Sequence, residues 1–403
     1  MRFLLINQFF APDPAPTGQF LADVARVLIQ SGHRVKVVCS GAPYEDCDAA
    51  GQHGLELADV HRVGGVAFGR GVVSRLASYG CFFVAAVRHS ISGPRPDVIL
   101  TLTTPPLLSL TGTLAKCVRG SRHAIWEMDM YPDVAVALGT FSSGGLLDRT
   151  VGALADMSRR QADKVIVLGP CMRNRLADRG IPLSKISVAH NWADGRRISP
   201  RPFPPPSPLV ALYSGNLGRA HDTATIGEAM RALTDPGRFQ FIFAGGGSGR
   251  AELQAVCRSR RTDNVQFLDY QGSEALADSL GRCHIGLVTQ TASTCGTLVP
   301  SKTYGLMAAG RPFIFIGPRE ATPALLIDQH KCGWHLEPGD SAGLMTLLEL
   351  LARNPYLIQD AGDRGRKAFL QTYDLPAGVA RILLILNATG NSAALPDSLA
   401  THK

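Results

Sequence analysis

Residues 300–303 place a proline, a serine and a lysine at the start of a short apolar segment. The run Pro300-Ser301-Lys302-Thr303 leads into a predicted helix that ends before Gly310. A serine at a helix start can accept hydrogen bonds from first-turn N–H groups. The remaining free N–H groups and the lysine ammonium attract anions. We therefore predict an anion-binding site at Ser301 and Lys302.

Two glycine-containing loops follow predicted strands and could complete this site. Gly215 and Asn216 precede Arg219, whose guanidinium can grip phosphate oxygens in bidentate fashion. Gly245 and Gly246 begin a glycine run that would let a base or ribose lie against the backbone. The alternative for the stretch with Gly215 is a turn with a solvent-facing arginine, and the alternative for the glycine run is a flexible loop.

A third loop, residues 9–18, contains three prolines and ends at Thr17 and Gly18. We expect it to be stiff, to bring backbone N–H groups to a helix start, and to form a wall of the cleft. A plain strand–helix connection is the alternative.

Length and charge define the broad class of protein. A chain of 403 residues exceeds one typical core and indicates two domains. The net charge of +8 suits anionic partners, which include phosphate ligands, an anionic membrane face and nucleic acid. The nine cysteines are dispersed without metal or redox spacing, so we predict no metal site and a reducing compartment. Residues 1–7 are too short for a signal core, and the stretch 79–87 is too short to span a membrane.

Short β-rich runs alternate with helical patterns, which is typical of doubly wound parallel sheets. The predicted strands are Phe3–Asn7, Val35–Cys39, Val98–Leu102, His123–Trp126, Lys164–Leu168, Ile186–Ala189, Leu209–Tyr213, Phe239–Ala244, Val265–Leu268, Ile285–Val288 and Pro312–Ile316.

Six prolines within residues 199–208 interrupt this alternation and predict an extended linker. We expect an N-terminal Rossmann-like domain at 1–198 and a second Rossmann-like domain at 209–374. A helix at 375–390 is expected to cross back to the first domain, followed by a tail at 391–403. Ligands of open α/β sheets sit beyond the carboxyl ends of the strands, so the cleft should lie between the domains.

The chain resembles a family 4 glycosyltransferase with the two-domain GT-B fold, in the branch that builds bacterial cell-surface polysaccharides and O-antigens. The matching segments lie in order from the first strand to beyond residue 310. They are residues 7–12 (Asn-Gln-Phe-Phe-Ala-Pro), 31–35 (Ser-Gly-His-Arg-Val), 128–133 (Met-Asp-Met-Tyr-Pro-Asp), 190–194 (His-Asn-Trp-Ala-Asp), 214–219 and 300–312.

The resemblance implies a retaining transferase that uses a nucleotide-activated sugar, with UDP favoured, and needs no cofactor or essential metal. Arg219 and Lys302 match the family's diphosphate-binding residues. The resemblance therefore implies a nucleotide-sugar-binding domain at 209–374 and an acceptor-side domain at 1–198. The implied acceptor is a glycan or polyprenyl-linked molecule, not nucleic acid. The implied location is cytoplasmic, with an inner-membrane surface as a further candidate partner.

One departure concerns the two glutamates that many family members carry eight positions apart. Thr297 and Gly305 occupy those positions, and neither is acidic. We therefore assign no ribose-binding carboxylate, and expect the backbone around Gly296 and Thr297 to contact the donor sugar.

On the acceptor side, Glu127, Asp129 and Asp133 follow a predicted strand. We favour Asp129 as the residue that orients or deprotonates an acceptor hydroxyl; turn formation and capping are the simpler roles. The basic, apolar segment 69–88 could lie on a membrane or pack as an ordinary helix.

Two other functions remain open. The missing glutamates would suit a non-catalytic GT-B subunit that binds nucleotide. A sugar-nucleotide epimerase or hydrolase on the same fold should carry several carboxylates and histidines in its donor pocket, and none is evident.

Overall fold

The computed structural model describes residues 1–13, 15–41, 55–56, 58–64, 72–259, 263–270, 272 and 275–390. The first part of the basic segment predicted at 69–88 and the predicted tail at 391–403 lie outside the described residues.

The first unit is a seven-stranded sheet in the order β3-β2-β1-β4-β5-β6-β7, with every pair of neighbours parallel. Its strands are β1 (Arg2–Ile6), β2 (Arg34–Ser40), β3 (Asp59–Val63), β4 (Val98–Thr101), β5 (Arg122–Glu127), β6 (Lys164–Val167) and β7 (Ile186–Val188). Its helices are α1 (Pro16–Gln30), α2 (Val72–Ile91), α3 (Ser109–Arg119), α4 (Asp133–Ala137), α5 (Leu146–Gln161) and α6 (Pro170–Asp178).

The second unit is a six-stranded parallel sheet in the order β10-β9-β8-β11-β12-β13. Its strands are β8 (Leu209–Ser214), β9 (Phe239–Ala244), β10 (Val265–Leu268), β11 (Ile285–Thr289), β12 (Phe313–Ile316) and β13 (Gly333–Leu336). The helices from here to the end are α7 (Ala224–Ala232), α8 (Ser248–Ser259), α9 (Leu276–Gly281), α10 (Lys302–Ala308), α11 (Thr322–His330), α12 (Ser341–Arg353), α13 (Pro355–Ala368) and α14 (Leu375–Gly390).

These two sheets confirm the predicted fold class of paired Rossmann-like α/β units. Two edge strands, β3 and β13, were absent from the sequence prediction. Their sequences, Asp-Val-His-Arg-Val and Gly-Trp-His-Leu, lack the continuous apolar run that marks a central parallel strand.

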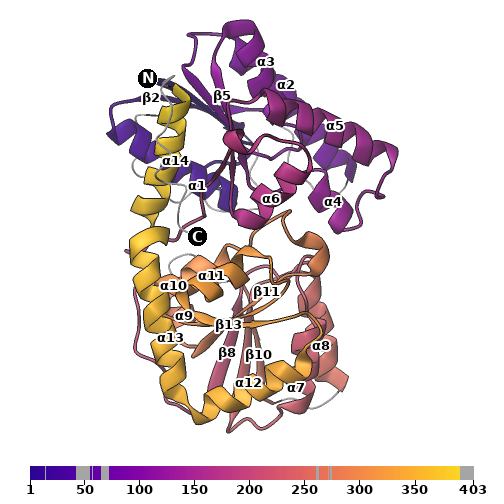
Figure 1. Cartoon of the computed structure of the whole chain (residues 1–403), viewed down its shortest axis with the longest axis vertical. Helices are drawn as coiled ribbons and strands as arrows, with labels where there is room; N and C mark the ends of the chain where they lie inside the picture. The colour runs from indigo at the N-terminus through magenta and orange to yellow at the C-terminus, as the bar shows by residue number, and fades with distance from the viewer. Residues whose placement is uncertain are drawn as a thin grey trace.

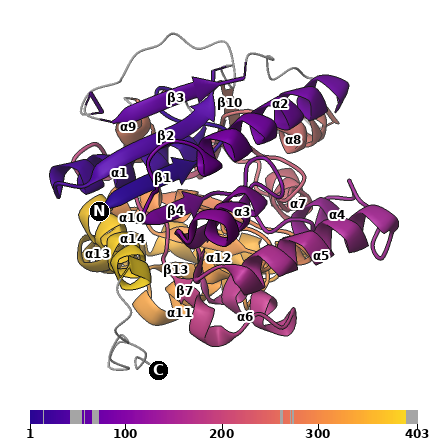
Figure 2. The same cartoon turned by 90° about the horizontal axis from the view of Figure 1, so that it is seen from above.

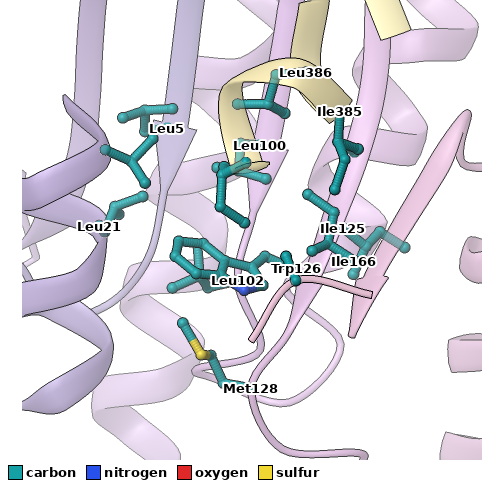
Figure 3. Close-up of a cluster of buried hydrophobic side chains, with 14 of the residues drawn as sticks. Leu5, Leu21, Leu100, Leu102, Ile125, Trp126, Met128, Ile166, Ile385 and Leu386 are labelled. Atoms are coloured by element: carbon teal, nitrogen blue, oxygen red, sulfur yellow. The ribbon is translucent and has the colours of Figure 1, made fainter. Parts of the chain in front are cut away.

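The helix α14 packs on the first sheet although it follows the second in sequence (Figure 1). Its apolar residues Ile385 and Leu386 join the core formed by Leu100, Ile125 and Trp126 of the sheet (Figure 3). Burial of these side chains ties the end of the chain to the N-terminal unit.

The proline-rich connection at 199–208 is held against the second unit by Arg311, which lies just after the predicted anion-binding helix. The buried guanidinium donates to the carbonyl oxygens of Arg201 and Pro202 at 3.0 and 2.9 Å. It also stacks on the Phe203 ring, with 4.0 Å between its Cζ and the ring centroid. The connection is therefore anchored, because a buried guanidinium needs its donors satisfied.

Among the described helices, none combines the length and apolar character needed to cross a bilayer.

Candidate active site

The carboxyl ends of the two sheets face each other, and backbone and side-chain contacts join the loops there. Met130, after β5, donates its N–H to the Thr297 carbonyl across the cleft at 2.8 Å. On the same side, Arg175 of α6 lies 3.4 Å from the carbonyl oxygen of Cys295. The loops after β5 and β11 therefore meet between the two sheets, where the sequence predicts the cleft.

Two glycine loops of the second unit interlock to form one wall. Gly215 donates its N–H to Ala244 at 2.8 Å, and Leu217 donates to Gly246 at 2.7 Å. Gly245 has a φ of +121°, and a Cβ there would lie 2.4 Å from the Gly215 carbonyl oxygen. Only glycine tolerates both the backbone angle and the close approach. The loops thus brace each other, while Gly246 faces open space and Asn216 is exposed.

Lys302, at the start of α10, lies over this platform. Its Nζ donates to the Tyr213 hydroxyl and lies 3.8 Å from the centroid of the Tyr213 ring. A Cβ on Gly215 would be 3.7 Å from the same Nζ. Burial lowers the pKa of Lys302 to about 7, because no carboxylate compensates for the lost hydration. The lysine can therefore gain charge when an anion arrives.

Ser301 does not cap α10 as the sequence suggested. Its backbone is already helical, with φ −75° and ψ −19°, and its side chain makes no capping hydrogen bond. A capping serine needs an extended backbone to turn its hydroxyl toward the first turn. Ser301 is exposed beside Lys302, so what remains at this helix start is the lysine and an uncapped backbone.

Arg219 lies at the edge of the cleft, with its side chain exposed. Its Nη2 is 3.4 Å from where a Cβ on Gly139, in the first unit, would lie. Among the described residues it has no acidic partner within ion-pair distance. The structure thus brings Lys302 to Gly215 but leaves Arg219 directed toward the facing unit.

His221 is a second basic residue near Lys302, and its side chain is half-buried. Its Nδ1 lies 2.8 Å from the Thr289 carbonyl, and its ring meets the Tyr213 ring edge-on at 5.8 Å. Burial, followed by the charge of Lys302, lowers the pKa of His221 to about 4. His221 is therefore neutral at pH 7 and adds no charge to the site.

On the facing wall, Asp129 follows β5 and is half-buried. Burial, reinforced by the nearby Glu127, raises the pKa of Asp129 to about 6. Its backbone N–H lies 3.3 Å from the Thr103 hydroxyl. The pKa of Tyr131 is raised by burial and by the charge of Asp129. The Asp129 side chain therefore changes from its protonated to its ionised form at a pH of about 6.

The two neighbouring acidic residues, Glu127 and Asp133, form ion pairs within the first unit. Glu127 accepts from Arg159 Nε at 2.8 Å, with both side chains almost fully buried. Asp133 lies 2.9 Å from Arg175 Nε and 3.3 Å from Arg179 Nη1. Of the three acidic residues, only Asp129 lacks an arginine partner among the described residues.

Thr17 and Gly18 shape the loop after β1. The Gly18 N–H donates to the Ala15 carbonyl at 3.0 Å, so this N–H group is hydrogen-bonded within the turn. A Cβ at Gly18 would come within 3.0 Å of the Phe10 nitrogen. Thr17 accepts a hydrogen bond from Asn7 Nδ2 at 3.3 Å. Their visible role is to let this loop fold onto the start of α1.

Gly296 and Thr297 join the two units. A Cβ on Gly296, which has φ +73°, would lie 3.0 Å from the Cys171 carbonyl of α6. The Thr297 side chain is buried and donates to Thr294 at 2.9 Å, and its carbonyl accepts from Met130. The hydroxyl and the carbonyl of Thr297 are therefore both hydrogen-bonded within the protein, and the backbone contact with the donor sugar stays a prediction.

The position of the missing second glutamate has room for a side chain. A Cβ on Gly305 would make ordinary contacts of 3.8 and 3.9 Å with Leu280 and Ile198. Backbone crowding therefore does not explain the glycine. Among the described residues, no cluster of three or more His, Cys, Asp or Glu side chains has the arrangement of a metal site.

Sequence comparison identifies a known domain in the first unit. Residues 17–192 match the glycosyl transferase 4-like domain. WbjE of Pseudomonas aeruginosa, named a probable glycosyltransferase, is 26% identical over 280 residues, covering 66% of this chain and 69% of WbjE. WcaI of Escherichia coli K12, named for colanic acid biosynthesis, is 24% identical over 340 residues, covering 77% of this chain and 82% of WcaI.

Solved structures share the whole architecture. A sucrose-phosphate synthase from Thermosynechococcus elongatus superposes with a TM-score of 0.75 at 15% identity, covering 96% of this chain and 98% of the synthase. HepE of Anabaena, solved with UDP-glucose, gives a TM-score of 0.70 at 16% identity, covering 96% of this chain and all of HepE. At these identities the likeness concerns the fold.

The facing Rossmann-like units are those of the GT-B fold. The chain is a glycosyltransferase whose N-terminal unit is a glycosyl transferase 4-like domain.

Proposed function

We propose that this enzyme moves a sugar from a nucleoside diphosphate, with a UDP-sugar favoured, to a glycan or lipid-linked acceptor in cell-surface polysaccharide synthesis, with retention of configuration. The observation that carries the proposal is Lys302 Nζ poised beside Gly215 on the interlocked glycine loops. Support comes from HepE, solved with UDP-glucose, and from the colanic acid assignment in the name of WcaI.

In this reaction the bond between the sugar C1 and the diphosphate oxygen breaks, and C1 bonds to the acceptor oxygen. Negative charge grows on the departing diphosphate, so a cation placed there stabilises the transition state more than the ground state. We assign this role to Lys302, charged by the arriving phosphates, and to Arg219 at the cleft edge. Asp129 orients the acceptor hydroxyl on the facing wall.

The remaining predicted residues divide by position. Gly215, Asn216, Gly245 and Gly246 form the donor wall, and exposed Ser301 lies at its edge. Thr17 and Gly18 support the acceptor side through the shape of the loop after β1. Gly296 and Thr297 hold the units together, and a contact of their backbone with the donor sugar stays a prediction.

The test measures nucleotide release from UDP-sugars with and without acceptor glycans. We expect release that depends on an acceptor and falls by about a hundredfold in Lys302→Ala and Arg219→Ala, as for loss of a charge that stabilises the transition state. Matched controls are Lys367→Ala and Arg258→Ala, which remove exposed cations of the second unit. Equal losses in the control variants would contradict these assignments.

Two outcomes would support other functions. Tight UDP binding without turnover, across a panel of donors and acceptors, would indicate a non-catalytic nucleotide-binding subunit. Conversion of the donor in the absence of any acceptor would indicate an epimerase or hydrolase.

A lipid-linked acceptor would place the enzyme on the cytoplasmic face of the inner membrane.

A further inference from the structure

A cavity lies between β13 and α13, at the edge of the second sheet. Its volume is about 390 Å³, which is within the range of about 300–1,000 Å³ that is usual for small-molecule sites. We call it the outer pocket. Its lining residues are Lys331, Gly333 and Trp334 on one side and Leu357, Ala361 and Arg364 of α13 on the other.

The outer pocket lies at the end of the second sheet that is opposite the cleft. Gly333, the first residue of β13, pairs with Phe313, the first residue of β12. The first residues of parallel strands mark the amino edge of a sheet, whereas the candidate active site lies at the carboxyl edge. The helix α13 runs along one side of the second unit and continues through residues 369–373 into α14 (Figure 1, Figure 2). The outer pocket is therefore separate from the donor site.

Trp334 gives the outer pocket an aromatic surface and a hydrogen-bond donor. It is half-buried and packs in part on the core of the second unit. Within the part of the chain that the structure describes, its indole N–H has no hydrogen-bond partner and is not sealed from solvent, and its ring contacts no other aromatic ring or cation. A tryptophan at a binding site combines an apolar face with a polar group that needs a partner. Trp334 can therefore pack on a ligand and donate a hydrogen bond to it.

Two cations also line the outer pocket. Lys331 is exposed, and its ammonium has no acidic partner among the described residues. Arg364 is fixed in place, because its Nε donates to the Lys331 carbonyl at 2.9 Å and its Nη1 donates to Asp360. Its Nη2 group has no acceptor in the described chain. The positive charge of the two cations exceeds the charge of the Asp360 carboxylate, which favours an anionic ligand.

Lys331 occupies a position that usually holds glycine. It ends α11 with φ +54° and ψ +36°, a left-handed conformation that favours Gly or Asn because a Cβ there costs free energy. Two roles would account for the lysine: its charge stabilises the C-terminal end of the helix dipole, or it pairs with an anion in the outer pocket. The first role concerns stability and the second concerns binding, so one variant can separate them.

We propose that the outer pocket binds a sugar ring that carries an anionic group. The ring of Trp334, with half-buried Leu357 and buried Ala361, would lie against the apolar C–H face of the sugar. Lys331 and Arg364 would pair with the carboxylate or phosphate through charge-assisted hydrogen bonds. Such a sugar has two sources, an acidic residue within a glycan and a free sugar phosphate. The proposal goes beyond the transfer reaction, because it needs neither UDP nor the cleft.

The test is calorimetric titration of the full chain at low salt with trigalacturonic acid, glucose 1-phosphate, neutral maltotriose and inorganic phosphate. We expect at least one of the two anionic sugars to bind. Maltotriose should bind about fivefold or more weakly because it lacks the anion, and phosphate about tenfold more weakly because it lacks the ring. Tighter binding of trigalacturonic acid would assign the pocket to an acidic glycan, and tighter binding of glucose 1-phosphate to a free sugar phosphate.

Variants of the pocket test the two contacts separately. Trp334→Ala should weaken binding about tenfold, and Trp334→Phe, which keeps an aromatic face, should weaken it less. Lys331→Gly should weaken binding about two- to fivefold while its melting temperature stays equal or rises, because glycine suits the left-handed backbone. Arg258→Ala, at an exposed arginine of α8, is the matched control and should bind as the wild type does.

Failure of both anionic sugars to bind would overturn the proposal. So would equal affinity for maltotriose, equal affinity for phosphate, or a Lys331→Gly variant that binds as tightly as the wild type.

UDP binding is measured on the same preparations to keep the two sites distinct. Lys302→Ala should lose UDP affinity and keep the anionic sugar, and Lys331→Gly should show the reverse. Loss of both ligands in either variant would contradict a separate pocket. A chain that binds UDP but no anionic sugar refutes only the outer pocket, whereas one that binds the sugar but no nucleotide refutes only the proposed transfer reaction.

Discussion

Lys302 Nζ donates a hydrogen bond to the Tyr213 hydroxyl and lies 3.8 Å from the centre of the same ring. The two residues come from α10 and β8, 89 positions apart. Tyr213 also donates to the Asn216 carbonyl at 3.0 Å. One tyrosine therefore links the lysine to the glycine loop on which we place the diphosphate.

The first prediction is that nucleotide binding takes up a proton at Lys302. Its pKa is about 7 in the free protein, and a bound diphosphate raises it because an opposite charge favours the ammonium. UDP affinity should therefore fall as pH rises above 7, by up to about tenfold per unit. Calorimetry at pH 8, in two buffers of different ionisation enthalpy, should report proton uptake approaching one per nucleotide.

The variant Lys302→Met checks the source of that proton, because it keeps much of the side-chain length and removes the amine. It should bind UDP more weakly, with little dependence on pH between 7 and 9. Undiminished proton uptake in this variant would assign the proton to another group.

A second prediction concerns Tyr213→Phe, which keeps the ring below Lys302 and removes the hydroxyl. Loss of hydrogen bonds of ordinary strength, about 0.5–1.5 kcal/mol each, should weaken UDP binding by about 2- to 12-fold. Tyr356→Phe, at an exposed tyrosine of α13, is the matched control. Binding by titration is the measurement, and an affinity equal to that of the control would show that the hydroxyl does not position the lysine.

The third prediction contrasts two adjacent glycines. Gly245→Ala should lower the free energy of unfolding by about 1–3 kcal/mol, because its φ is +121° and its Cβ would meet the Gly215 carbonyl at 2.4 Å. Gly246→Ala should cost under about 0.5 kcal/mol, since a Cβ there meets open space. Denaturant unfolding measures both, and similar values would refute the interlocked-loop account.

The fourth prediction separates Asp129 from its acidic neighbour. Asp129→Asn should reduce kcat by about 100-fold while leaving UDP affinity unchanged, as expected for a group that acts on the acceptor. The wild-type rate should rise as pH increases through about 6, where Asp129 becomes charged, and the variant should lack this rise. The pH dependence of kcat is the measurement.

Glu127→Gln provides the contrast, because it removes one of the two carboxylates that pair with the buried Arg159. We expect a loss of about 3–5 kcal/mol of stability, as for other broken buried ion pairs. If Asp129→Asn also destabilised the fold by this amount, its role would be structural.

Much of the fold could be predicted from the sequence because the central strands of both sheets are continuous apolar runs. Each predicted strand has a counterpart whose ends differ from the predicted ones by at most one residue. The edge strands β3 and β13 were not predicted because polar residues or glycine interrupt their short sequences, Asp-Val-His-Arg-Val and Gly-Trp-His-Leu.

The candidate site was only partly predictable. The glycines at 215 and 245 and the lysine at 302 were evident as residue types after predicted strands. The contact of Lys302 with Tyr213 could not be predicted, because a tyrosine within an apolar strand has the same sequence signal as any core residue. No sequence pattern indicates that Thr297 is buried, or that its carbonyl accepts a hydrogen bond from the facing unit.

The sequence by itself determined the alternation of strands and helices, the position of the linker and the residue types in each loop, since these follow from local periodicity and backbone preference. Only the tertiary structure decided which loops contact each other and which apolar residues remain exposed to solvent. On α2, apolar residues occur on both sides of the helix, so periodicity cannot tell Phe82 in the core from Val84 at the surface. That distinction depends on where the sheet and α3 lie.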